Sequence, residues 1–125
     1  MTLNEYQEKA MRYCTQPCQN LAYMLTGLMA EVGELAGHIQ KPIRADDAIF
    51  RDNQLSPKYL LDQECLENFV EMKEELLLEL GDTLWMVAGF AYRLGATLED
   101  VAMGNLSTID SRAERGKIEG NGDHR

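Results

Sequence analysis

Apolar residues recur at helical spacing along most of the chain. Between residues 20 and 41 they follow one another at alternating steps of four and three, at Leu21, Leu25, Leu28, Val32, Leu35 and Ile39. A repeat of this kind forms one apolar face on an α-helix. A second repeat lies toward the end of residues 57–94, at Leu76, Leu80, Leu84, Val87, Ala91 and Leu94. The pattern therefore predicts two long helices.

Local start and stop signals set the expected limits of these helices. A first, shorter helix is expected over residues 3–14, and Pro42 is expected to end the helix that follows it. Ser56 followed by Pro57 is typical of a helix N-terminus, because serine caps free N–H groups and proline suits the first helical position. We therefore expect the second long helix to begin at Pro57. The sequence leaves open whether it is continuous or breaks near residue 68.

The C-terminal part of the chain carries the clearest helix signals. Gly95 is expected to end the second long helix. Thr97, with Asp100 three residues later, predicts a capping box at the start of a last helix over residues 98–115. The glycines of residues 116–125 predict an extended tail.

The elements together predict the fold class. No alternating run of Val, Ile or Thr stands out, and residues 42–56 have no sustained period, so this segment is interpreted as a loop. We expect an all-α fold, a four- to five-helix bundle with antiparallel helices and an extended C-terminal tail. The length of 125 residues predicts a single domain, 1–125.

Composition narrows the classes of function. The net charge of −9 disfavours binding to a nucleic acid polymer, although a divalent cation would still allow a small phosphorylated ligand. No apolar run approaches the roughly 18 residues of a membrane span, and the first residues lack the pattern of a signal peptide. The expected location is therefore cytoplasmic and not membrane-bound. The three cysteines, an odd number without paired spacing, are interpreted as free thiols.

Acidic residues lie where a helix would bury or half-bury them. Glu31 and Glu34 fall on one flank of the apolar face of residues 20–41, and Glu79 and Asp82 form a similar pair on the second long helix. Like charges one turn apart cost an isolated helix about 0.2–0.5 kcal/mol per pair. No lysine at the i+4 position relieves this repulsion. A solvated helix edge would explain Glu31 and Glu34 taken alone, but the second pair favours a bound cation.

The two pairs would face one another if the two long helices pack antiparallel. Carboxylate oxygens without cysteine suit Mg²⁺, with Mn²⁺ as a substitute, and Mg²⁺ often completes its coordination with substrate phosphates. A di-iron site is the competing interpretation, but it needs Glu-x-x-His on paired helices. His38 follows Glu34 by four residues, which disfavours that site.

The last helix supplies polar and basic groups. Asn105 falls in an apolar sector, where its amide needs a partner, and Arg112 lies close to the same line two turns later. Arg112 and Lys117 are candidates for contact with phosphate oxygens. An asparagine in such a sector also fits a purely structural role, and four acidic residues are interleaved with the basic ones.

These residues together resemble the MazG-like, all-α nucleotide pyrophosphohydrolases, whose signature is E-x-x-E on one helix and E-x-x-D on the next. The matches here are "EVGE", with Glu31 and Glu34, and "ELGD", with Glu79 and Asp82. The flanking words "GLMAEVGELAGHIQK", "EELLLELGDTLWMVAGFAYRLG" and "LEDVAMGNL" and the ending "RAERGKIEGNGDHR" are also similar to the family. Residues 42–68 stand outside the resemblance and are interpreted as an insertion.

The resemblance implies an enzyme that hydrolyses nucleoside triphosphates between the α- and β-phosphates, releasing monophosphate and pyrophosphate, with a role in nucleotide-pool house-cleaning. It implies that Glu31, Glu34, Glu79 and Asp82 hold Mg²⁺. Among these, Glu34 and Glu79 are the expected catalytic residues.

The resemblance also suggests substrate contacts and an assembly. Asn105, Arg112, Lys117, Trp85 and His38 are the expected substrate-binding residues. Trp85 also suits a place in the core or in an interface. A line of Leu78, Trp85 and Tyr92 needs a cover, and a homodimer or a dimer of dimers would supply it.

One position departs from the family pattern. Thr108 stands three residues after Asn105, where the family commonly carries a lysine. The departure favours an alternative, a non-catalytic nucleotide or metal sensor. A second alternative is a helical interaction protein whose acidic residues are only surface.

Overall fold

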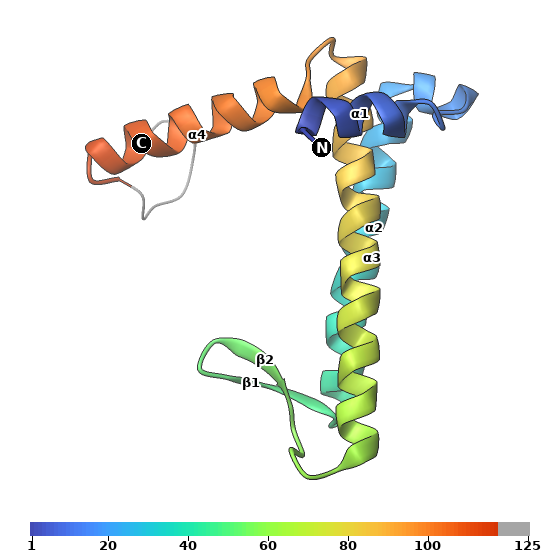
Figure 1. The fold of residues 1–125 in the computed structure, drawn as a ribbon, viewed down its shortest axis with the longest axis vertical. Helices are drawn as coiled ribbons and strands as arrows, with labels where there is room; N and C mark the ends of the chain where they lie inside the picture. Colours follow the sequence, from blue (N-terminus) through green and yellow to red (C-terminus); the bar gives the residue numbers. More distant parts are fainter. Residues whose placement is uncertain (118–125) are drawn as a thin grey trace. The chain divides into compact units, whose positions relative to one another are not determined.

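The fold, known from a computed structural model, is described for residues 1–117. It is mostly helical, as predicted, with one small antiparallel sheet added (Figure 1). In chain order its elements are α1 (Leu3–Met11), a short 3-10 helix (Gln16–Gln19), α2 (Leu21–Arg44), β1 (Ala48–Arg51), β2 (Gln54–Pro57), α3 (Gln63–Arg93) and α4 (Leu98–Glu114).

The chain divides into two compact units. The first unit contains Met1–Leu21 together with the chain from Ala88 onward, and the second contains Ala22–Val87. In the second unit α2 and α3 run side by side, with the β1–β2 hairpin at the end where they connect (Figure 1). The helix α3 is continuous through residue 68, which answers the question that the sequence left open.

The regular apolar repeat of α2 is covered only in part, because Leu28, Leu35 and Ile39 are half-buried. Met24 is fully buried, whereas Leu25 and Val32 each remain 47% exposed. The buried side chains of α3 in this unit are Cys65, Met72 and Met86. Methionine is therefore prominent among the side chains that the two helices bury.

Residues 42–56 are not a loop, and two predictions for this part of the chain are wrong. Pro42 does not end α2, which continues to Arg44. A proline in the last turn removes a single helical hydrogen bond, so the helix tolerates it there. Beyond it, β1 and β2 pair in antiparallel register, with Ala48 opposite Pro57.

The hairpin turn and the start of α3 have local causes. Asp52 and Asn53 both adopt positive φ, at 48° and 63°, as a two-residue hairpin turn requires. Ser56 and Pro57 lie in β2, so they do not begin a helix. Instead the Asp62 carboxylate accepts the Cys65 N–H at 2.9 Å and caps α3.

One buried side chain connects three parts of the first unit. Gln7 of α1 is 5% exposed, and its amide donates to the carbonyls of Ala88 at 3.0 Å and Ala96 at 3.2 Å. Its carbonyl oxygen accepts the Leu98 N–H at 3.1 Å. Gln7 therefore holds α1 against the end of α3 and the start of α4.

The start of α4 matches its prediction. Thr97 and Asp100 form a reciprocal capping box, and Gly95 adopts φ 74° just after α3. The side-chain and backbone hydrogen bonds from Thr97 hold the pKa of Asp100 below its ordinary value. Nearby, the Asn4 amide donates to Glu99 at 2.8 Å, which adds a second contact between α1 and α4.

The N-terminal helix is shorter than predicted, and the thiols are free as predicted. The helix α1 ends at Met11, three residues before the expected limit. Cys14, Cys18 and Cys65 form no disulfide. Burial and the neighbouring Cys18 raise the pKa of Cys14 to about 11, so this thiol is a poor nucleophile. From residue 118 on, the predicted tail lies outside the described residues.

Candidate metal centre and active site

Three carboxylates meet between α2 and α3. Glu31 lies on α2, and Glu79 and Asp82 lie one turn apart on α3. One oxygen atom of each carboxylate lies within 4.8 Å of an oxygen of the other two. Glu31 and Glu79 are half-buried and Asp82 is exposed, so the group is open to solvent on one side. We call these three residues the acidic cluster.

The acidic cluster has an unfavourable charge balance of its own. The pKa of Glu31 is raised above its ordinary value, first by burial and then by the negative charges of Asp82, Glu34 and Glu79. Within residues 1–117, no lysine or arginine forms an ion pair with any member of the cluster. The folded chain therefore holds negative charge here without a basic side chain to balance it.

His38 forms one edge of the acidic cluster. Its Nδ1 lies 2.7 Å from Glu75 Oε2, and its Nε2 lies 3.4 Å from Glu79 Oε1. The ring thus bridges two carboxylates that are one turn apart on α3. This contact is the only one from an ionisable basic group to the cluster among the described residues.

Glu34 is not part of the three-residue cluster. It lies on α2 one turn after Glu31 and is exposed. Its charge still contributes to the raised pKa of Glu31, so it lies within electrostatic range. A carboxylate in this place is free to reorient toward a bound ligand.

One side of the acidic cluster is filled by protein. A Cβ atom on Gly27, one turn before Glu31, would lie 2.7 Å from both Sδ and Cε of Met86. A Cβ atom at this position would require the end of the buried Met86 side chain to shift, because Met86 packs directly on the α2 backbone. The cluster therefore has little room beside it in the direction of Gly27.

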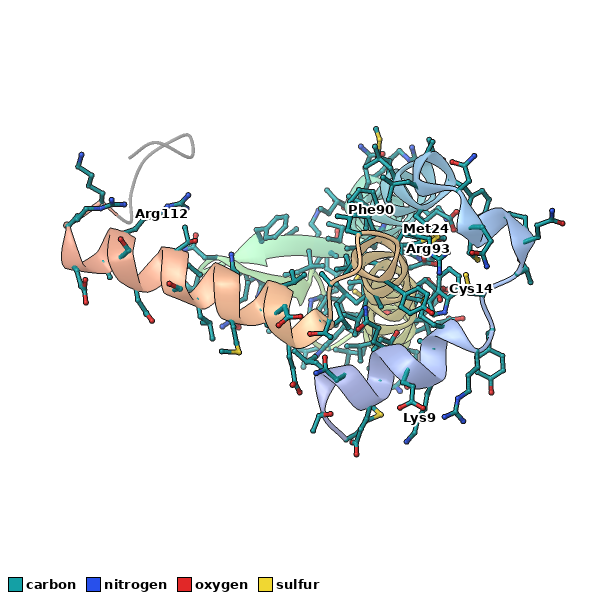
Figure 2. All side chains as sticks on the ribbon, turned by 90° about the horizontal axis from the view of Figure 1, so that it is seen from above. Lys9, Cys14, Met24, Phe90, Arg93 and Arg112 are labelled. Atoms are coloured by element: carbon teal, nitrogen blue, oxygen red, sulfur yellow. The ribbon has the colours of Figure 1, made fainter. Side chains whose placement is uncertain are left out.

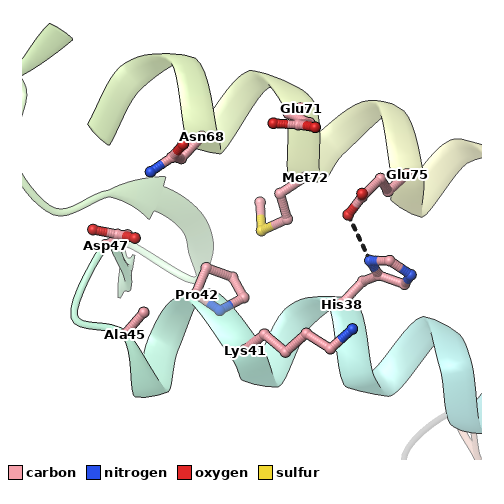
Figure 3. Close-up of a pocket in the computed structure, with 9 residues that line it drawn as sticks. All are labelled: His38, Lys41, Pro42, Ala45, Asp47, Asn68, Glu71, Met72 and Glu75. Atoms are coloured by element: carbon pink, nitrogen blue, oxygen red, sulfur yellow. Dashed lines mark hydrogen bonds and ion pairs between the residues drawn. The ribbon is translucent and has the colours of Figure 1, made fainter. Parts of the chain in front are cut away.

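In the opposite direction along α2, beyond His38, lies a cleft of about 320 Å³. Figure 3 shows His38 and Glu75 at one end of this cleft and Asp47 and Asn68 at the other. Met72 projects between them. The full lining is His38, Lys41, Pro42, Ala45, Asp47, Asn68, Glu71, Met72 and Glu75.

Sequence reasoning did not identify most of the cleft. His38 was expected to bind substrate, but Lys41, Asp47 and Asn68 carried no prediction. Asp47 stands beside the hairpin, and the hairpin itself was interpreted as a loop. The only available signal was the Asp52–Asn53 pair, because both residue types tolerate the positive φ of a tight hairpin turn.

The predicted groups of the last helix belong to the first unit, and the acidic cluster to the second. Figure 2 labels Arg112 on α4. Arg112 is half-buried, and Asn105 on the same helix is exposed. Lys117 follows the helix and is exposed. Thr108, at the position of the family lysine, donates its hydroxyl to the Gly104 carbonyl at 2.9 Å. Its side chain is therefore engaged by its own helix.

Trp85 lies on α3 in the same unit as the acidic cluster and is half-buried. It falls one turn after Asp82 along the helix. Leu78, on the same predicted line, is 70% exposed. This line of α3 is thus only partly covered within one chain.

The donor atoms of the acidic cluster suit a hard cation. All are carboxylate oxygens, and no sulfur lies among them. Such a set is typical of Mg²⁺ or Mn²⁺, which bind through few carboxylates and retain open positions for water or phosphate oxygens. The raised pKa of Glu31 fits the same interpretation, because a cation would favour its ionised form.

Comparison with known proteins agrees with the family resemblance of the sequence. Residues 19–116 match the family described as the MazG nucleotide pyrophosphohydrolase domain. The chain is also 33% identical over 107 residues to the Gene 37 protein of Mycobacterium phage L5, covering 86% of this chain and 78% of that protein. No solved structure matches. None of the helices within residues 1–117 has an apolar stretch long enough to cross a bilayer. The chain belongs to the MazG nucleotide pyrophosphohydrolase family.

Proposed function

We propose that this protein is a Mg²⁺-dependent nucleoside triphosphate pyrophosphohydrolase. It would release a nucleoside monophosphate and pyrophosphate and so serve the clearing of nucleotide pools. One observation carries the proposal: Glu31, Glu79 and Asp82 bring their oxygens within 4.8 Å of one another without a lysine or arginine partner in the described chain. A site with this excess of negative charge suits a divalent cation and, through it, a polyphosphate.

The carboxylates have separable roles in this proposal. Glu31, Glu79 and Asp82 would hold the metal ion. When bound, Mg²⁺ would neutralise phosphate charge and lower the pKa of a coordinated water. Glu34 is exposed one turn from Glu31 and would complete the ligand set or accept the proton of the attacking water. Glu79, which also contacts His38, is the second carboxylate that we assign to catalysis.

Groups beyond the acidic cluster would bind the rest of the substrate. We assign phosphate contacts to Arg112 and Lys117, and a sugar or base contact to Asn105. His38 would face the substrate from the edge of the cluster. Trp85 would either stack on the base or pack in an interface, and both roles use its half-buried ring.

We further propose that the protein assembles as a homodimer or as a dimer of dimers. Large apolar side chains remain exposed on both long helices of the second unit, among them Met29 at 68%, Leu77 at 68% and Leu78 at 70%. Apolar surface of this extent is typical of an interface. Light scattering that gave the mass of a single chain would contradict the assembly.

A sensor that binds nucleotide without turnover is the second candidate. The hydroxyl of Thr108 is bonded to its own helix, so it does not replace the phosphate contact of a lysine. Fewer phosphate contacts would weaken transition-state stabilisation more than they would weaken metal binding.

The test is product release from a panel of ribo- and deoxynucleoside triphosphates, with and without Mg²⁺. We expect release of monophosphate and pyrophosphate that needs the metal and falls at least about 100-fold in Glu79→Gln. Glu74→Gln is the matched control, because Glu74 is an exposed glutamate on the same helix. Absence of release from every triphosphate, with retained nucleotide binding, would favour the sensor instead.

A further inference from the structure

The cleft beside His38 lies where the nucleoside part of a nucleotide would lie if its phosphates bound at the acidic cluster. The cleft adjoins the acidic cluster through His38, which lines the cleft and also lies 3.4 Å from Glu79 Oε1. The opposite direction is filled by Met86 at Gly27. A substrate whose phosphates lie at the acidic cluster would therefore extend toward Met72 and Asn68.

The dimensions of the cleft agree with this direction. Met72 precedes Glu79 by seven residues, which is about 10 Å along a helix. Asn68 lies one further turn away. Glu79 and Asn68 are therefore about 16 Å apart along α3, a distance that a metal-bound α-phosphate, its sugar and its base would span together. The buried Met72 and the half-buried Pro42 offer apolar contact to a base ring between these points.

The charge of the cleft opposes phosphate and suits a hydrogen-bond donor. Its lining contains three carboxylates, from Asp47, Glu71 and Glu75, against the single lysine Lys41. Carboxylates accept hydrogen bonds but, when ionised, do not donate them. The ligand group at this end must therefore carry N–H or O–H donors.

Asp47 is held in place by its backbone. Its N–H donates to the Pro42 carbonyl at 2.9 Å, and its own carbonyl accepts the Lys58 N–H at 2.8 Å and the Cys65 thiol at 3.1 Å. Within the described chain, no hydrogen bond engages the Asp47 carboxylate or the Asn68 amide. The chain just before the hairpin thus places an unengaged carboxylate at the cleft, and Asn68 adds an amide that both donates and accepts.

We propose that this cleft binds the nucleobase of the substrate and selects bases that carry an exocyclic amino group. Asp47 accepts from the amino group, and Asn68 contacts the neighbouring ring nitrogen or carbonyl. The pairing of carboxylate with the cytosine amine, and of asparagine with adenine, is the known chemistry of base recognition. A carbonyl oxygen in the same place, as in uracil or hypoxanthine, would face the carboxylate oxygens and be repelled. The inference rests on the proposed hydrolase function and adds its base selectivity.

The experiment compares substrates that differ at this one substituent. The pairs are CTP with UTP, and ATP with ITP, each measured as kcat/KM with Mg²⁺. We expect the amino-bearing member to be preferred at least about tenfold, the effect of about 1.4 kcal/mol of discrimination. Asp47→Asn should reduce that preference to less than about threefold, because the amide offers a donor as well as an acceptor. Asn68→Ala, a change on the exposed surface of α3, should also reduce it.

Asp52→Asn is the matched control for Asp47→Asn. It removes the same charge from the hairpin, at its exposed turn and outside the cleft lining. It should leave the preference unchanged. Equal kcat/KM within both substrate pairs for the wild type would overturn the inference while leaving the hydrolase intact. A preference that survives both Asp47→Asn and Asn68→Ala would also overturn it.

A binding measurement tests the base-binding cleft independently of the proposed hydrolase activity. Backbone amide NMR shifts are followed while CMP or UMP is added to the wild-type protein. Shifts at Asp47 and Asn68 with CMP, but weaker ones with UMP, would support the cleft even if no triphosphate is hydrolysed. Failure of both nucleotides to perturb these residues would count against it.

Discussion

The two units of the chain use polar side chains in opposite ways. In the first unit the buried Gln7 is fully engaged, with three hydrogen bonds to backbone groups. In the second unit Glu31 is half-buried among other carboxylates, and its pKa is raised as a result. Gln7 thus supplies hydrogen-bond partners to its neighbours, whereas Glu31 lacks a partner of opposite charge among the described residues.

This difference distinguishes a polar residue that stabilises the fold from one that needs a bound ligand. A buried polar group that is fully hydrogen-bonded stabilises the fold and needs nothing more. A group of like charges without a basic partner destabilises the fold unless a ligand compensates. Substitutions that remove the polar group should therefore change stability in opposite directions in the two units.

The largest expected effect on stability is at Gln7. Gln7→Leu would leave the Leu98 N–H and two carbonyls without their partner, at about 1–3 kcal/mol for each buried group left unsatisfied. We expect the free energy of unfolding to fall by about 2–4 kcal/mol, measured by urea denaturation. Gln16→Leu, at an exposed position of the same unit, should change it little. Equal effects of the two substitutions would contradict the stabilising role of the Gln7 hydrogen bonds.

The next effect depends on the metal. Mg²⁺ at 100 times its dissociation constant should stabilise the wild type by about 2.7 kcal/mol, seen as a rise in Tm of several degrees. Glu79→Gln should lose most of this rise, and Glu74→Gln should keep it. A wild-type Tm that does not respond to Mg²⁺ or Mn²⁺ would contradict the assignment of the acidic cluster as a metal site, and with it the contrast with Gln7.

The smallest effect has the opposite sign from that at Gln7. In metal-free buffer, Glu31→Gln should raise the free energy of unfolding by a few tenths to about 1 kcal/mol, because it removes repulsion from Asp82 and Glu79. Thermal unfolding in EDTA measures it. Destabilisation by this substitution would mean that Glu31 makes a favourable contact in the folded chain, contrary to its raised pKa.

Sequence period predicted the helices, and local signals predicted the junction of α3 with α4, although the expected end of α1, the end of α2 at Pro42 and the start of α3 at Pro57 were wrong. The capping box at Thr97 and the glycine at Gly95 are short-range features, so they could be recognised without tertiary information. The hairpin was missed because its strands have four residues each, too few for an alternating pattern to stand out. The Asp52–Asn53 turn was the better signal, and it was available.

The candidate site was predictable only in part for a physical reason. The i, i+3 spacing places Glu79 beside Asp82 from sequence alone. The approach of Glu31 depends on the rotation of α2 against α3, and the most regular apolar repeat gave no measure of that rotation: Leu25 stays exposed while Met24 is buried. The cleft depends on where the hairpin places Asp47, which is a tertiary property.

The packing of Met86 on Gly27 also bears on chemical durability. Methionine supplies three of the buried apolar side chains that α2 and α3 contribute to the second unit, at Met24, Met72 and Met86, beside Cys65. Thioethers adapt to irregular gaps, but oxidants convert them to polar sulfoxides. The Met86 sulfur lies 2.7 Å from the Cβ position of Gly27, so an added oxygen would find little space on that side. The burial of Met86 should therefore slow its oxidation, and an increase in its oxidation rate would report opening between the two helices.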